Sequence, residues 1–407
     1  MKRKKQRRIK PLLFVVVGAV LVVALWWVFG RTDSTGPVAN TEPEPTTQTT
    51  TKPKQTKTTL RLIATGDMLP HDTVNQAART ATGYDYRPIF SNVSQYLRDA
   101  DMAYCNQESP SAKQFSVSGY PTFNAPTEFA QDLSDEGCNI INLANNHAND
   151  RGQAGINGTL NVWDSLPTLA VAGTARNSAG QDRIAYFTKG GIKFAYLGYS
   201  KCSNSTLANS YGLNLLSRSL FNSQLAEARA GGAQMIIVGT HWCRENISTQ
   251  TAEQDEWANY FASKGVDIVI GTGPHWLQPV KSLPRAGGGK TIVWFSLGNF
   301  LSTQLELNGL IGGIAVMDID ISSHSVTDVG FMPTYMHYEW TASEKARGDL
   351  LARHNLKLYP LDQAAGALAR SQNHTSVSAQ TRRVTDLMNK YTDVTMLTSK
   401  TYASFGR

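Results

Sequence analysis

The sequence predicts a layered α/β fold with mixed sheets, and three features lead to that prediction. From residue 60 onward, short runs rich in aliphatic and β-branched residues alternate with amphipathic stretches, as in folds that stack helices on sheets. Two of these runs are joined through Gly190 and Gly191, which is typical of an antiparallel hairpin. The 407 residues are 41% hydrophobic and 17% charged, a composition that supports a sizeable core.

The N-terminus has the features of a membrane anchor. Residues 1–10 form a basic segment, and residues 11–30 form an apolar run without a charge. Such a run is close in length to the about 20 residues that cross a bilayer. Trp26 and Trp27 lie near its outer end, as interfacial aromatic residues do. Positive charge before the span predicts a cytoplasmic N-terminus and an extracellular main domain.

We therefore expect a single-pass protein of the cell membrane. A cleavable signal peptide is the alternative, but no Ala-x-Ala cleavage site follows the apolar run. Residues 31–58 are rich in Thr and Pro and have almost no large apolar side chains. This composition predicts a disordered tether, because such a segment cannot bury enough surface to fold.

The net charge is concentrated at the N-terminus. The chain has a formal charge of +7, and the seven Lys and Arg residues of positions 1–10 account for all of it. The remainder is balanced, so no basic face for nucleic acid follows from the composition. We expect the membrane as a partner and no nucleic acid.

The main domain is predicted to span residues 59–335. Its expected strands are 60–65, 102–105, 139–144, 169–172, 183–188, 193–199, 235–238, 266–270, 291–296 and 314–321. Its expected helices are 72–81, 89–98, 127–136, 153–165, 220–230 and 251–264. Residues 336–407 are polar with helical periodicity, which predicts a helical C-terminal extension with helices at 342–355, 361–372 and 379–391.

Polar side chains follow six of the predicted strands at the point where each strand ends. These residues are Asp67; Asn106 and Glu108; Asn145, Asn146 and His147; His241; His275; and Asn299. Ligands collect at the carboxyl ends of strands in α/β proteins, and Asp, Glu, Asn and His are ligands of Mn, Zn, Fe or Mg ions. The sequence therefore predicts a common site at one edge of the sheets.

Each of these residues alone also has a structural interpretation. A single His at a strand end is more often a hydrogen-bonded structural residue than a ligand. Asn145, Asn146 and Asp150 have the side chains that cap a following helix. Six such strand ends in sequence order favour the common site over a series of unrelated caps.

The four cysteines give no metal-binding pattern. Cys105, Cys138, Cys202 and Cys243 show no CxxC spacing. Outside the cell membrane, disulfides would be permitted. The sequence leaves their pairing open, with four free thiols as the alternative.

The strand ends carry short motifs in a characteristic order. These are Gly66-Asp67, Asn106-x-Glu108-Ser109, Ala144-Asn-Asn-His147, His241-Trp242-x-x-Glu245, Gly271-x-Gly-Pro-His275 and Ser296-Leu-Gly-Asn-Phe300. The series resembles the CapA/PgsA family of poly-γ-glutamate capsule synthesis proteins. That family in turn is similar to calcineurin-like metallophosphoesterases. The resemblance implies a four-layer α/β/β/α sandwich with mixed sheets and a site for one or two divalent metal ions (Mn, Zn, Fe or Mg).

The resemblance also implies roles for individual residues. As metal ligands it implies Asp67, Glu108, Asn146, His241 and His275. His147 and Glu108 are the implied catalytic residues, with His147 as general acid. The implied supporting residues are Asn106, Asn145, Glu245 and Asn299. The expected partners are other membrane subunits of a capsule-synthesis system and an anionic polymer such as poly-γ-glutamate.

Three positions depart from the metallophosphoesterase pattern. That pattern has Asp-x-His where this chain has Asp67, Met68 and Leu69, and His71 comes two positions later. Gly273 stands where the later Gly-His-x-His motif has a histidine. Cys243 follows His241-Trp242, where the family commonly has glycine. One metal or an altered pair is therefore expected, in a metal-dependent hydrolase or, alternatively, in a non-catalytic polymer-binding scaffold.

Overall fold

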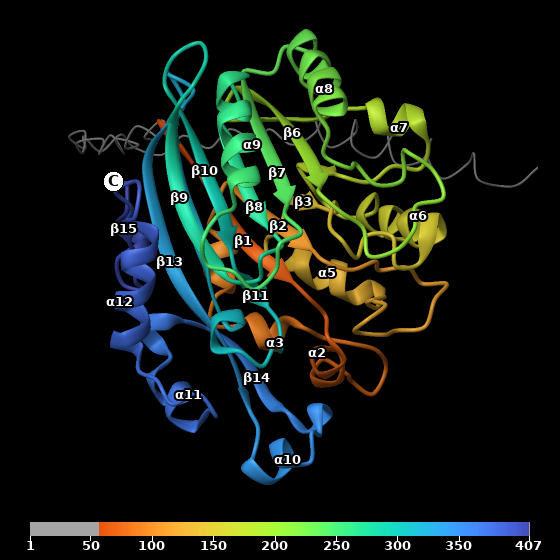
Figure 1. The fold of residues 1–407 in the computed structure, drawn as a ribbon, viewed down its shortest axis with the longest axis vertical. Helices are drawn as coiled ribbons and strands as arrows, with labels where there is room; N and C mark the ends of the chain where they lie inside the picture. Colours follow the sequence, from red (N-terminus) through yellow and green to blue (C-terminus); the bar gives the residue numbers. More distant parts are fainter. Residues whose placement is uncertain (1–56, 407) are drawn as a thin grey trace, which may run out of the picture. The chain divides into compact units, whose positions relative to one another are not determined.

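The structure of the protein, a computed structural model, describes residues 57–406 (Figure 1). The predicted cytoplasmic segment, the predicted anchor and nearly all of the predicted tether lie outside these residues. Within the described part of the chain, no helix has both the length and the apolar character needed to cross a membrane.

The larger of two sheets has nine strands and contains the first strand of the domain. Its main path runs in the order β14-β13-β12-β1-β2-β3-β4, with β11 paired to β1 and β15 paired to β13. The strands are β1 (Thr59–Met68), β2 (Met102–Gln107), β3 (Ile140–Asn142), β4 (Ala170–Ala172), β11 (Asn299–Leu301), β12 (Ile311–Asp320), β13 (Ser325–Glu339), β14 (His354–Pro360) and β15 (Thr395–Met396). Strands β1 to β4 are parallel, whereas β12 to β14 pair antiparallel.

The second sheet has six strands in the order β5-β6-β7-β8-β10-β9. Its strands are β5 (Ala185–Lys189), β6 (Ile192–Ser200), β7 (Met235–His241), β8 (Ile268–Thr272), β9 (Leu277–Pro284) and β10 (Lys290–Leu297). The inner four strands are parallel, and the edge strands β5 and β9 are antiparallel to their neighbours. The predicted hairpin forms between β5 and β6, where Gly190 and Gly191 both have positive φ angles.

The helices are mostly short. They are α2 (Asp72–Ala77), α3 (Arg87–Phe90), α4 (Ser94–Arg98), α5 (Thr127–Asp135), α6 (Gly152–Trp163), α7 (Ser178–Asp182), α8 (Arg218–Ala230), α9 (Ala252–Ser263), α10 (Ala342–Ala346), α11 (Ala365–Arg370) and α12 (Val377–Met388), with 3-10 turns η1 (Leu307–Gly309), η2 (Leu350–Ala352), η3 (Leu361–Gln363) and η4 (Tyr402–Ser404). Local sequence explains where several of them begin. Thr251 and Gln254 form a capping box at the start of α9, which satisfies backbone donors that a helix leaves free.

The two sheets pack face to face, with helices on the outside. Tyr104 of β2 meets Tyr196 of β6 edge to face, with ring centroids 6.0 Å apart. The indole nitrogen of Trp294 in β10 lies 3.4 Å from the sulfur of Met317 in β12. Helices α8 and α9 cover the opposite face of the six-stranded sheet, where their apolar side chains share a buried cluster with β6, β7, β8 and β10 (Figure 1). The predicted mixed, layered α/β fold is therefore confirmed.

The C-terminal extension, which was predicted to be helical, contains strands as well as helices. Residues His354–Pro360 form β14, in which Leu356 and Leu358 are buried and Lys357 is less so. This alternation has the two-residue period of a strand with one face on the core. The helix predicted at 342–355 ends at Ala346, shortly before Gly348 with its φ of 66°. Helices α11 and α12 do form in this segment.

Two predicted helices near the N-terminus of the domain are shorter than expected. The helix predicted at 72–81 ends at Ala77. The helix predicted at 89–98 is divided into α3 and α4. Apolar side chains of these helices are buried in the same cluster as strands of the nine-stranded sheet. Such tertiary packing overrides local helix preference and cannot be predicted from the local sequence. Strands β9 and β13 were also not predicted from the sequence.

Candidate metal centre

The parallel strands of both sheets end at one edge of the sandwich, and polar residues gather there. Asp67 lies at the end of β1, and Glu108 follows β2 directly. His241 is the last residue of β7, and His275 lies between β8 and β9. All four side chains are buried. The arrangement follows from the parallel pairing, because parallel strands bring their carboxyl ends to the same edge of a sheet.

Asp67 is held in a network of hydrogen bonds. Its Oδ1 accepts a bond of 2.8 Å from Nδ2 of Asn106. Its Oδ2 accepts a bond of 2.9 Å from the backbone N–H of Gly273 and lies 3.1 Å from Nδ1 of His275. Burial acts to raise the pKa of Asp67, but the hydrogen bond and the charge of His275 outweigh it and lower this pKa to about 2. Asp67 is therefore a carboxylate at neutral pH.

Nδ1 of His275 lies near two oxygen atoms. Its Nδ1 lies between Oδ2 of Asp67 and Oδ1 of Asn299, which is 3.0 Å away. The Asn299 amide is oriented by a bond of 2.9 Å from its Nδ2 to the carbonyl of Gly309. Burial acts to lower the pKa of His275, but the interaction with Asp67 raises it overall. The backbone of His275 has a φ of 61°, a strained conformation of the kind found at functional sites.

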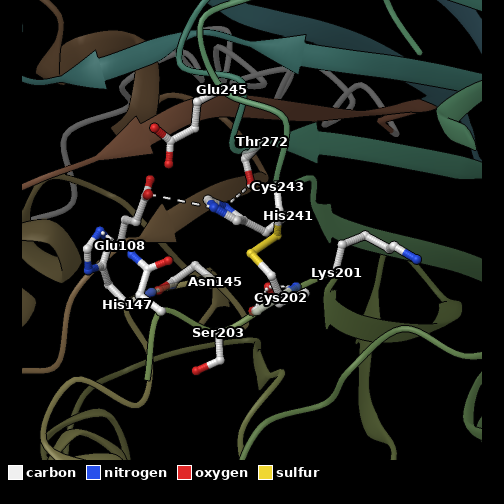
Figure 2. The surroundings of a disulfide bond; sticks show 12 residues. Glu108, Asn145, His147, Lys201, Cys202, Ser203, His241, Cys243, Glu245 and Thr272 are labelled. Atoms are coloured by element: carbon white, nitrogen blue, oxygen red, sulfur yellow. Dashed lines mark hydrogen bonds and ion pairs between the residues drawn. A yellow bond between two sulfur atoms is a disulfide. The ribbon is translucent and has the colours of Figure 1, made fainter. Parts of the chain in front are cut away.

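The two ring nitrogens of His241 face Thr272 and Glu108. Its Nδ1 lies 3.1 Å from the hydroxyl of Thr272, and its Nε2 lies 3.6 Å from Oε1 of Glu108 (Figure 2). Burial lowers the pKa of His241 to about 3. The imidazole is therefore neutral at physiological pH, and neutral imidazole is the form that binds metal ions.

Glu108 provides the test of whether this group of side chains fits a metal ion. Both of its carboxyl oxygens are buried and have no hydrogen-bond partner among residues 57–406. Burial, followed by the negative charge of Asp67, raises the pKa of Glu108 well above its usual value. A buried carboxyl without partners is costly, and a cation would satisfy it. The residues therefore fit a metal ion.

The number and type of donor atoms support the same conclusion. Asp67, Glu108 and His275 each offer one donor atom, and these atoms all lie within 4.8 Å of one another. Oδ1 of Asn146 is also buried without a partner in the described part of the chain. Carboxylate, amide and imidazole donors suit divalent first-row ions and Mg.

His147 lies beside this group and is paired with an acid. Its Nδ1 is 2.8 Å from Oδ2 of Asp150, and that oxygen also accepts a bond of 2.7 Å from the backbone N–H of Phe123. Its Nε2 is 3.3 Å from Nδ2 of Asn204. Oδ1 of Asn145 accepts a bond from the His147 backbone N–H. Asp150 thus fixes the imidazole so that Nε2 points away from it.

The capping interpretation of these residues does not hold. The residue before α6 is Arg151, and no side chain makes a capping hydrogen bond there. Asn145 instead donates a bond of 2.8 Å from Nδ2 to the carbonyl of Gln107, which ties the loop after β3 to the end of β2. Asn145 is therefore a residue that positions the loop.

His275 is the member of the group that lines a neighbouring cleft of about 680 Å³. The cleft is lined by Leu69, His71, Tyr120, Pro121, Thr122, His147, Asp150, Asn204, Ser205, Glu245, His275 and Gln304. Glu245 places Oε1 3.9 Å from Nε2 of His275. None of these lining residues is Lys or Arg. The cleft itself supplies no positive side chain other than a protonated histidine.

Several residues of the site were not found from the sequence. Asp150 was expected only as a cap, and its pairing with His147 became visible in the structure. Asn204 and Thr272 carry no sequence signal, because polar residues in a loop or at a strand end are common. His71 lines the cleft although it is two positions away from the histidine of the Asp-x-His motif.

All four cysteines form disulfides. Cys105 is bonded to Cys138, and Cys202 is bonded to Cys243. Figure 2 shows the second bond close to His241, with the side chains of Glu108 and His147 in the same region. Because its sulfur is bonded to Cys202, Cys243 is not a metal ligand in this structure.

Comparison with known proteins identifies relatives of the chain. Capsule biosynthesis protein CapA of Bacillus anthracis is 25% identical over 315 residues, which cover 74% of this chain and 70% of that protein. PGA biosynthesis protein CapA of Bacillus subtilis is 27% identical over 223 residues, which cover 53% of this chain and 57% of that protein. A solved structure described as a novel phosphatase from Mycoplasma pneumoniae aligns with a TM-score of 0.43 at 13% identity, covering 68% of this chain and 93% of that one.

The family match covers most of the residues described above. Residues 61–304 match the family described as bacterial capsule synthesis protein PGA_cap. This range contains every strand end that contributes to the site, from Asp67 to Asn299. The chain therefore belongs to the PGA_cap family of bacterial capsule synthesis proteins.

Proposed function

We propose that this protein acts in the synthesis or export of an anionic capsule polymer and that its buried site is a metal-dependent hydrolase site. The observation that carries the proposal is Glu108, whose two buried oxygens lack partners among the described residues and lie next to two histidines. Such a carboxyl is costly unless a cation is bound to it. The names of the two relatives support the capsule role.

Asp67, Glu108, Asn146, His241 and His275 would hold the ion. A bound divalent ion supplies Lewis acidity and lowers the pKa of water, which gives a nucleophile near neutral pH. Neighbouring groups of the chain hold two of the proposed ligands in position. Asn106 and the backbone of Gly273 keep Asp67 in place, and Asn299 orients His275.

His147 would move the proton. Its Nε2 lies on the side away from Asp150, where it can donate a proton to a leaving group. The imidazole and the carboxylate of this pair are enclosed, since His147 and Asp150 line the cleft and their side chains are nearly buried. Glu108 is the second residue proposed to act in proton transfer, since a carboxyl group can take up and release a proton once its surroundings tune its pKa.

The proposed substrate is a phosphoester or an amide bond of a polymer such as poly-γ-glutamate. The cleft lining has acidic Asp150 and Glu245 and no Lys or Arg, so positive charge for an anionic substrate would come from the ion. We further propose that the apolar run at residues 11–30 anchors the protein in the cell membrane. The main domain would then be extracellular and would work beside other membrane subunits of the capsule system.

A non-catalytic polymer-binding scaffold is the second candidate function. The observation that favours it is the loss of two histidines of the metallophosphoesterase pattern, at the positions of Leu69 and Gly273. Leu69 is buried, and its backbone N–H donates to the carbonyl of Leu301. A scaffold would keep the cleft and the fold without turnover.

Chelation distinguishes the two functions. We expect the metal-loaded protein to hydrolyse at least one substrate in a panel of phosphoesters and γ-glutamyl amides, and we expect a chelator to abolish that turnover. Turnover should return when the ion is restored. A folded, metal-loaded protein without turnover on any member of the panel would contradict the hydrolase and favour the scaffold.

A further inference from the structure

The loop after β6 connects the two halves of the site. Residues 201–206 contain no helix or strand. On one side the backbone N–H of Lys201 donates a bond of 2.9 Å to the carbonyl of His241. The Cys202–Cys243 disulfide joins the loop to the chain two residues beyond His241 (Figure 2). This side of the loop is therefore fixed to the end of β7 in the six-stranded sheet.

The other side of the same loop contacts the segment after β3 in the nine-stranded sheet. The backbone N–H of Asn204 donates a bond of 2.8 Å to the carbonyl of Asn146. Nδ2 of Asn204 lies 3.3 Å from Nε2 of His147. The hydroxyl of Ser205 donates a bond of 2.9 Å to the carbonyl of Asn149. The loop thus spans from His241 to Asn146, two of the proposed ligands that come from different sheets.

The two disulfides differ in their exposure. Cys105 and Cys138 are buried, with 0% and 1% of their surface exposed. Cys243 is exposed and Cys202 is half-buried. Thiol–disulfide exchange requires access of a thiolate to a sulfur atom. A dithiol therefore reaches the Cys202–Cys243 bond, whereas the fold protects the Cys105–Cys138 bond.

We propose that Cys202–Cys243 is a redox modification site that controls retention of the metal ion. The inference rests on the proposed metal centre. A thiolate of a dithiol attacks the sulfur of Cys243, the more exposed of the two residues, and forms a mixed disulfide, and the Cys202 thiolate leaves and takes up a proton. The second thiol of the reagent then closes its own disulfide and releases Cys243 as a thiol. Two electrons pass from the dithiol to the protein.

Reduction removes the covalent link on one side of the loop. The segment that bonds to Asn146 and His147 is then held to the end of β7 by the hydrogen bond from Lys201 to His241 without the covalent link. The spacing of the proposed ligands at the ends of β3 and β7 is therefore held less tightly. Groups that orient metal ligands without binding the metal typically change metal affinity by about 10–100-fold when they are removed. We expect reduction to accelerate metal release by a factor in that range.

The experiment uses the full-length oxidised protein loaded with zinc or manganese. A limited amount of dithiol is added, and alkylation with mass spectrometry verifies that only Cys202 and Cys243 are reduced. Metal transfer to a chromogenic chelator is followed over time. Amide hydrogen exchange of residues 145–150 is measured on the same samples. We expect both metal release and exchange to be faster after reduction.

Variants separate the disulfide from other effects. The Cys202→Ser/Cys243→Ser protein should release metal rapidly without dithiol, and added dithiol should have no further effect, which excludes chelation by the reagent. Asn204→Ala should accelerate exchange at residues 145–150. Asn209→Ala is the matched control, because the Asn209 side chain donates to Gln153 in α6 and not to residues 145–150.

Two results would overturn the inference in distinguishable ways. Unchanged metal release and unchanged exchange after selective reduction would show that the disulfide does not control the site. An oxidised protein that binds no metal would refute the proposed metal centre. In that case hydrogen exchange alone still decides whether the disulfide holds residues 145–150 in place.

Discussion

Replacement of His147 by Ala is expected to lower turnover by about 10²–10⁴-fold, the range that a positioned general acid contributes. The bound metal should remain, because Nδ1 of His147 pairs with Asp150 and Nε2 lies beside Asn204, so neither nitrogen is assigned to the ion. The measurement is kcat/KM on the best substrate of the panel, together with the metal content of the same sample. Asp150→Asn should lower turnover less than His147→Ala does, because it removes the charge that supports the imidazole but leaves the His147 ring in place.

His374→Ala is the matched control for this substitution. His374 is exposed and does not line the cleft, so its loss should leave turnover and metal content unchanged. Loss of metal from the His147→Ala protein would show that His147 is a ligand. Full turnover in that protein would show that the proton comes from another group.

Substitution of Gly273 by His is expected to destabilise the protein, although it restores a histidine of the metallophosphoesterase pattern. Gly273 has a φ of +98°, and a Cβ at this position would lie 2.0 Å from the carbonyl oxygen of Trp242. Backbone strain and overpacking each cost about 1–3 kcal/mol, so we expect a loss of about 2–6 kcal/mol in the free energy of unfolding. The hydrogen bonds from Gly273 to Asp67 should also be disturbed. Denaturant unfolding measures the effect.

Gly287→His separates strain from the steric clash. Gly287 has a φ of +86°, and no atom lies within 4 Å of a Cβ added there. The free energy of unfolding of the Gly287→His variant should therefore fall only by the cost of backbone strain, and that of the Gly273→His variant should fall clearly more. A Gly273→His protein with unchanged stability and an additional bound metal would show that the second histidine fits, contrary to the geometry.

The strand ends of the site were predictable because their signal is local. An apolar run that is typical of a buried strand precedes each of Asp67, Glu108, His241 and His275. Parallel pairing alone places the ends of such strands at one edge. The order of short motifs also identified the family correctly. Neither inference required knowledge of contacts between distant segments.

The remaining features depend on contacts that distant segments make. The disulfide pairing was open from the sequence, because any pairing of four cysteines satisfies their spacing. The Asp150 carboxylate that pairs with His147 also accepts a hydrogen bond from the backbone of Phe123, which lies in a different segment. Strand β14 pairs with the edge of β13, and the helical periodicity of the segments on either side obscured its own short alternating pattern. Tertiary contacts override local preference at such positions.

The metal content of the folded protein tests the central claim most directly. The full-length wild type, Asp67→Ala and His241→Ala would be offered manganese, zinc and iron, freed of loosely bound ions and measured by elemental analysis. Circular dichroism would verify that all three are folded. We predict stoichiometric metal in the wild type and its loss in both variants, which would place residues from the two sheets in one centre. A folded wild type without metal, or variants that retain it, would contradict the account.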